Sequence, residues 1–160
     1  MKTKILALGC LLAFSLFAAE PSKPAAFEIR LVLDKAAADS EPLICAHPGT
    51  AAGNAVEERL HVQKLPLLDR SAIKTAVAAK NPLTGASEID LTFTASGAKR
   101  FAQITRDHVG ERLAIVVDGK VRSAPRVAAE IAGGKAQISG SFSEQEAAAL
   151  AKSLNATAAR

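Results

Sequence analysis

The stretch RLAIVVDGKVRSAPRV, residues 112–127, decides the fold class expected for this chain. Arg112 to Asp118 is almost entirely apolar, which is typical of a central strand that is buried on both faces. Asp118-Gly119 predicts a hairpin, because a type I′ turn needs positive φ at both of its central residues. The return strand is expected from Lys120 to Val127, and Pro125 predicts that this strand lies at a sheet edge or a bulge.

Alternation of apolar and polar residues predicts further strands on either side of this hairpin. Apolar residues recur at every second position in 27–34, 58–65 and 88–94, and a last short strand is expected over 135–140. Residues 35–58 are mixed, and we interpret them as a short strand around Leu43 followed by a loop. Gly85 and the Gly133-Gly134 pair predict turns between these elements.

Three helices are predicted from the spacing of apolar residues and from capping signals. The first runs from Leu67 to Asn81, the second from Ala95 to Val109, and the third follows Ser143. Ser143 and Glu146 form a capping box, since each side chain can satisfy a backbone N–H of the other. We therefore predict an α+β fold with two layers, in which helices pack on one face of a mainly antiparallel sheet.

The first residues have the layout of a secretory signal peptide. Lys2 and Lys4 precede an apolar run from Ile5 to Phe17, and small residues follow. We assign residues 1–18 to the signal peptide, 19–26 to a Pro-rich linker, 27–155 to one domain and 156–160 to a frayed tail. The alternative is a lipid anchor at Cys10, which we rank lower because only five apolar residues precede it. No other segment is apolar for the roughly 20 residues that a membrane span needs.

Charge and cysteine content narrow the classes of partner. Two of the 20 basic residues, Lys2 and Lys4, belong to the targeting segment, which leaves 18 against 16 acidic residues. These charges are interleaved, whereas nucleic-acid binders carry a concentrated basic stripe, so we expect no nucleic-acid partner.

Cys45 is then the one cysteine of the exported domain, and it cannot form an internal disulfide. Its apolar neighbours favour burial.

Residues with catalytic chemistry are present but lack a supporting motif. His47, His61 and His108 do not have the spacing of zinc ligands. Ser96, His108 and Asp118 could be combined into a nucleophilic triad, yet no Gly-x-Ser-x-Gly elbow accompanies them. Gly133-Gly134 lies between two predicted strands, which favours a turn over a phosphate loop. We therefore expect no enzyme, no cofactor and no metal, and rank a hydrolase as the least favoured function.

Residues 81–154 contain a long series of motifs that resemble one protein family. The motifs are NPLTG (81–85), EIDLTFT (88–94), GAKRF (97–101), TRDHVG (105–110), LAIVVDGKV (113–121), SAP (123–125), IAGGKAQISG (131–140) and FSEQEA (142–147). Together they are similar to the head subdomain of the first periplasmic domain of SecD, a subunit of the SecDF protein-export machinery. The resemblance implies the fold of that head, a location outside the cytoplasmic membrane and an affinity for extended polypeptide. Proton-driven pulling is not implied, because the helices that perform it have no counterpart up to Arg160.

The expected polypeptide-binding surface consists of Lys120, Arg122, Arg126 and Lys135, on the return strand and the loop after it. The alternative is that these are solvated charges which protect an edge strand from aggregation. We expect a binding domain accessory to protein export or to envelope protein quality control, with the Sec machinery among its candidate partners. The second hypothesis is an interaction or regulatory domain that binds one specific folded partner.

Overall fold

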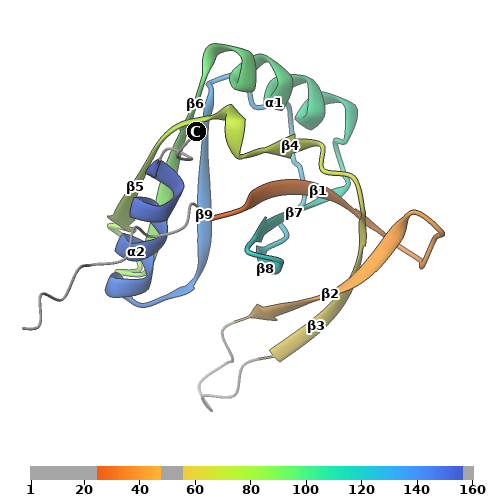
Figure 1. Cartoon of the computed structure of the whole chain (residues 1–160), viewed down its shortest axis with the longest axis horizontal. Helices are drawn as coiled ribbons and strands as arrows, with labels where there is room; N and C mark the ends of the chain where they lie inside the picture. Colours follow the sequence, from red (N-terminus) through yellow and green to blue (C-terminus); the bar gives the residue numbers. More distant parts are fainter. Residues whose placement is uncertain (1–24, 48–55, 157–160) are drawn as a thin grey trace, which may run out of the picture.

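The computed structural model of the chain describes residues 25–47 and 56–156 (Figure 1). The predicted signal peptide, Cys10, most of the linker and nearly all of the tail lie outside the described residues. The strands are β1 (Phe27–Leu33), β2 (Ser40–His47), β3 (Val56–Gln63), β4 (Leu68–Asp69), β5 (Ile73–Lys80), β6 (Ser87–Phe93), β7 (Arg112–Val117), β8 (Lys120–Ser123) and β9 (Lys135–Phe142). The helices are the 3-10 turn η1 (Arg70–Ala72), α1 (Ala95–Asp107) and α2 (Glu144–Asn155).

Six strands form the larger sheet, in the order β3-β2-β8-β7-β1-β4. An additional pairing of β3 with β1 closes five of these strands into a ring. The closure occurs at Val32, which pairs with Arg112 on β7 and with Val62 on β3. Every pairing is antiparallel except that of β2 with β8, where Cys45 lies opposite Val121.

The remaining strands form a separate antiparallel sheet in the order β5-β6-β9. In Figure 1 this sheet stands beside the ring, with α1 across its upper end and α2 against β5. The fold is therefore a sheet-dominated α+β fold, as predicted, but the prediction of a single sheet is wrong. The pairing that divides the strands joins residues far apart in the sequence, and local patterns do not encode it.

Two hydrophobic cores follow from this arrangement, and β7 supplies both. Its alternate residues Leu113, Ile115 and Val117 join the larger core, which also buries Phe101 of α1 and Leu154 of α2. Ala114 and Val116 join a smaller core with residues from β2, β3 and β8. The prediction that residues 112–118 form a central strand buried on both faces is confirmed.

The β7–β8 hairpin is also confirmed. Of the two positions expected for its return strand, the sheet edge is wrong, whereas the pairing register does shift between Ile115 and Val116, as at a bulge. Asp118 and Gly119 have φ of 49° and 75°, the left-handed geometry that a type I′ turn requires. The return strand β8 ends at Ser123, and it pairs with β7 on one side and β2 on the other. Pro125 follows the strand and does not interrupt it, so its missing N–H removes no hydrogen bond between β8 and its neighbours.

The predicted helix from Leu67 to Asn81 is the largest error. The structure has β4, the single turn η1 and the eight-residue strand β5 in its place. Asp69 does cap a helical turn, because its carboxylate accepts a hydrogen bond from the backbone N–H of Ser71, but that turn lasts three residues. The other two helices lie within a few residues of their predicted bounds.

Strand bounds differ less from the predictions. β3 begins and ends two residues before the predicted 58–65, and β2 extends the expected short strand over eight residues. β1, β6 and β9 lie within two residues of their predicted ends.

Candidate binding surface

The four cations of the predicted surface are spread over three segments. Lys120 is exposed at the start of β8, and Lys135 is exposed at the start of β9. Arg122 is half-buried, and its guanidinium carbon lies 6.0 Å from the centre of the Phe142 ring. Arg126 lies beyond β8 and donates a hydrogen bond to the carbonyl oxygen of Gly110. Their role in polypeptide binding stays a prediction.

The turns and the cap that the sequence singled out have clear structural roles. Gly85 and Gly134 have φ of 70° and 65°, whereas Gly133 keeps ordinary backbone geometry. At the start of α2, the Glu146 carboxylate accepts a hydrogen bond from the N–H of Ser143 at 2.8 Å. The Ser143 hydroxyl accepts one from the N–H of Glu146 at 3.2 Å. The hydrogen bonds from the Ser143 backbone and side chain hold the pKa of Glu146 below its usual value.

An apolar cleft of about 340 Å³ opens beneath segment 125–131. This segment has no helix or strand, and it joins β8 to the loop before β9. The walls of the cleft come from β1, β6, β7, β9 and α1: Phe27, Ile29, Leu91, Leu113, Ile115, Ala136, Phe101 and Thr105. Arg126 and Glu130 are its charged lining residues, and both are exposed.

Thr105 attaches segment 125–131 to α1. Its side chain is 1% exposed, and its hydroxyl donates to the carbonyl oxygen of Phe101 at 2.9 Å. The Thr105 hydroxyl oxygen in turn accepts a hydrogen bond from the backbone N–H of Ile131, also at 2.9 Å. Thr105 therefore positions the far end of the segment. In the sequence Thr105 begins the matching stretch TRDHVG (105–110), but no local pattern indicates a hydrogen bond to Ile131.

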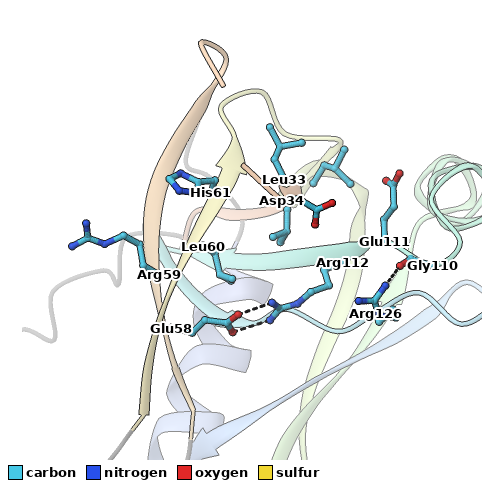
Figure 2. Close-up of a pocket in the computed structure, with 12 residues that line it drawn as sticks. Leu33, Asp34, Glu58, Arg59, Leu60, His61, Gly110, Glu111, Arg112 and Arg126 are labelled. Atoms are coloured by element: carbon cyan, nitrogen blue, oxygen red, sulfur yellow. Dashed lines mark hydrogen bonds and ion pairs between the residues drawn. The ribbon is translucent and has the colours of Figure 1, made fainter. Parts of the chain in front are cut away.

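A second hollow, the polar cavity, has a volume of about 390 Å³ and lies between the end of β1, β3 and the start of β7 (Figure 2). Glu58 and Arg112 meet in it through two hydrogen bonds of 2.7 and 2.9 Å. The Arg112 Nε donates to the carbonyl oxygen of Ala124 at 3.0 Å. The hydrogen bonds to Glu58 raise the pKa of Arg112. This arrangement ties three segments of the ring together, which is a structural role.

The structure does not assemble a nucleophilic triad from the residues considered in the sequence. Ser96 is in the first turn of α1 and His108 follows its last turn, so they lie roughly 18 Å apart along the helix axis. The Nδ1 of His108 contacts the Glu111 carboxylate at 2.7 Å instead. Burial raises the pKa of the Cys45 thiol, which disfavours the reactive thiolate. Across residues 25–47 and 56–156 no three His, Cys, Asp or Glu side chains are grouped to hold a metal ion.

This chain is similar in sequence and in fold to known proteins. A family model described as the SecDF P1 head subdomain matches residues 48–159. Protein translocase subunit SecD of Magnetococcus marinus is 54% identical over 70 residues, which are 44% of this chain and 13% of that protein. SecD of Syntrophobacter fumaroxidans is 37% identical over 124 residues, which are 78% of this chain and 23% of that protein. The chain thus spans less than a quarter of the length of either relative.

Solved structures agree with the family model. A crystal structure of SecDF in a super-membrane-facing form superposes with a TM-score of 0.65 at 30% identity, covering 84% of this chain and 19% of that one. A structure of SecDF, described as a membrane component that enhances protein export, has a TM-score of 0.63 at 27% identity and covers 84% and 63%. No helix within the described part of the chain is long and apolar enough to span a membrane. The family model covers well over half of the sequence, which confirms the resemblance drawn from residues 81–154, and the chain belongs to the SecDF P1 head subdomain family.

Proposed function

We propose that this chain is an exported, non-catalytic domain that binds extended polypeptide in its apolar cleft. The apolar cleft is the observation that supports this function. It is open to solvent, its walls are aliphatic and aromatic, and its charged residues lie on the exposed segment that borders it. Such a site suits the side chains of an unfolded chain, which lack a core of their own.

The size of the cleft suits weak, reversible binding. Its volume of about 340 Å³ accommodates one or two large apolar side chains. Burying one Leu or Phe side chain contributes about 1.5–3 kcal/mol. Association also loses translational and rotational freedom, so only a part of that gain appears as affinity. A site that handles passing chains must release them again, and weak binding supports this.

The relatives support a role in export. Those matched over part of their length are called protein translocase subunit SecD, and SecDF is described as enhancing protein export. We propose that this domain acts outside the cytoplasmic membrane, accessory to protein export or to envelope protein quality control, with a Sec component as a candidate partner. Lys120, Arg122 and Lys135 are proposed to attract acidic stretches of the bound polypeptide, beside Arg126 at the cleft.

The direct test is a titration of the 160-residue chain with an unfolded exported polypeptide, followed by amide chemical shifts. We expect shifts concentrated in residues 125–136 and in the strands that line the cleft. Ile131 is 41% exposed at the cleft, so Ile131→Asp should weaken binding roughly tenfold, because the burial of a large apolar side chain is lost. Leu83 is 93% exposed in the β5–β6 turn and does not line the cleft, so Leu83→Asp is the matched control.

Two outcomes would contradict the proposal. Absence of binding up to high micromolar concentration would exclude a general polypeptide site. Equal binding by the wild type and the Ile131→Asp variant would place the site elsewhere. One stoichiometric folded partner from an envelope pull-down, without binding of unfolded chains, would instead support the interaction-domain hypothesis.

A further inference from the structure

The outer edge of β9 carries backbone groups that face away from its sheet. The N–H of Phe93 donates to the carbonyl oxygen of Gly134 at 2.9 Å, so Phe93 directs its backbone toward the β9 side. Backbone direction alternates along an antiparallel ladder. Ala136 and Ile138, opposite Leu91 and Ile89, therefore bond to β6.

The residues between them, Lys135, Gln137 and Ser139, consequently direct their N–H and C=O groups outward. Within the described part of the chain, these outward groups make no hydrogen bond to another segment. They supply donor and acceptor pairs at a spacing of two residues, the spacing that an added strand requires. A sheet edge of this kind is a template for another chain.

The opposite edge of the same sheet is closed by a side chain. Asn155, at the end of α2, accepts a hydrogen bond from the N–H of Ala76 at 2.8 Å through Oδ1. Its Nδ2 donates to the carbonyl oxygen of Ala76 at 2.7 Å. The amide thus imitates a paired strand at the middle of β5, and Lys74 and Lys80 lie on either side along that strand. Edge lysines are a common protection against strand pairing, and β9 also has one, Lys135, at its start. Within the described residues no side chain occupies the outward backbone groups of β9 as Asn155 occupies those of Ala76, so β9 is the more open edge.

The open edge borders the apolar cleft. Ala136 of β9 lines the cleft together with Leu91 and Ile131. The side chains of Lys135 and Gln137 lie on the other face of the sheet and are exposed, and Gln137 donates to the Asp90 carboxylate at 3.0 Å. A strand placed along β9 would therefore direct alternate side chains into the cleft and toward a polar face.

We propose that polypeptide binds by adding to β9 as a fourth strand of the β5-β6-β9 sheet. The occupant is an extended segment with apolar residues at every second position and polar residues between them. The backbone groups of Lys135, Gln137 and Ser139 hold the main chain, and the cleft receives the apolar side chains. This inference rests on the proposed function and specifies how the same site recognises its ligand.

The test uses a ten-residue peptide of alternating Leu and Thr and two N-methylated forms, one methylated at every Leu and the other at every Thr. In an added strand, only one of these alternate sets donates N–H groups to β9. Methylation of that set should weaken binding by roughly fivefold for each hydrogen bond lost. Methylation of the other set should leave the dissociation constant unchanged. The set whose methylation weakens binding also reports the strand direction. In antiparallel addition that set is the Thr residues, whose side chains lie on the polar face of the sheet.

Variants of the chain give an independent measurement. Gln137→Pro removes one outward N–H without removing a bond to β6, and should weaken peptide binding about fivefold. Gln137→Ala controls for the lost side chain, and Ala78→Pro removes an outward N–H from β5; both should bind as the wild type does. If the two methylated peptides bind equally, whether as tightly as the parent or equally weakly, strand addition is wrong. If the unmethylated peptide and unfolded exported chains all fail to bind, the proposed function itself fails.

Discussion

Replacing Thr105 by Val should release segment 125–131 from α1 while preserving the shape of the core. Valine substitutes a methyl group for the hydroxyl that accepts the Ile131 N–H at 2.9 Å. The carbonyl oxygen of Phe101, which also loses the hydroxyl donor, remains the acceptor for the helical N–H of Thr105 itself. The loss is therefore concentrated on one backbone N–H of the segment.

The magnitude follows from the burial of the two partners. A donor left without an acceptor costs about 1–3 kcal/mol when it is fully buried. Thr105 is buried but Ile131 is 41% exposed, so water can partly replace the lost acceptor. We expect the free energy of unfolding to fall by about 1 kcal/mol, toward the lower end of that range. In urea this corresponds to a midpoint lower by roughly 0.5 M.

Hydrogen exchange distinguishes release of the segment from general destabilisation. In Thr105→Val the Ile131 amide should exchange faster, while amides of β7 change only with the global stability. Thr105→Ser keeps the hydroxyl and removes the methyl, so it should lose a similar stability yet keep Ile131 protected. Unchanged exchange at Ile131 in the valine variant, or equal loss of protection in both variants, would refute this account of the segment.

Three further substitutions test contacts of the two helices outside the cleft. Asn155→Ala removes both hydrogen bonds to the outer edge of β5 and should cost about 1–2 kcal/mol in urea unfolding, with Asn155→Asp at least as unstable. Gly97→Ala should lower the free energy of unfolding by roughly 1–3 kcal/mol, because the new Cβ would lie 2.5 Å from the carbonyl oxygen of Ala72. Alanine favours helices, so a more stable variant would contradict this contact. The pKa of Glu146 is lowered by the hydrogen bonds from Ser143, so its contribution is present above the usual glutamate pKa and is lost as the pH falls through the lowered value. Glu146→Gln should therefore unfold more easily than the wild type at pH 7, and the difference should shrink in acid; a difference independent of pH would argue against the carboxylate.

Local signals were sufficient where an element is specified by its own residues. The hairpin at Asp118-Gly119 needs positive φ at both positions, and this dipeptide accommodates it at little cost. α2 has its capping box and an apolar stripe, with Ala147, Ala151 and Leu154 buried. In these elements the sequence pattern and the tertiary environment favour the same structure.

β5 shows why local signals failed elsewhere. Ile73, Ala76 and Val77 have a helical spacing, and alanine favours helices. In the structure Ala76 is buried while Val77 is 59% exposed, which is the alternation of a strand. Alanine at neighbouring positions hides that alternation, since it fits either face. Pairing with β6 along the whole strand and the bonds from Asn155 decide the outcome. β6 is the next strand along the chain, but Asn155 is distant from Ala76 in the sequence, so local spacing does not reveal its contact.

The cleft was beyond sequence reasoning for a related reason. Phe27, Phe101 and Leu113 look like ordinary core residues, because each belongs to an amphipathic or buried element. They line a cleft because segment 125–131 covers this part of the core without a strand or helix of its own. Of the residues singled out for the predicted surface, Arg126 is the one that lines this cleft.

The way this segment is attached explains how an open cleft can occur in an otherwise well-paired fold. At its start, Val127 exchanges backbone hydrogen bonds with Glu111 and Gly110, both at 2.8 Å. At its end, Ile131 is held by Thr105. Between them, residues 128–130 are exposed and make no hydrogen bond to the rest of the described chain. Opening this short span breaks little structure, so its free energy of opening should be well below that of the strands. The adjustable wall of the cleft thus adjoins the paired strand β9, so under the proposed strand addition the cleft would accept side chains of different size while the backbone pairing stays the same.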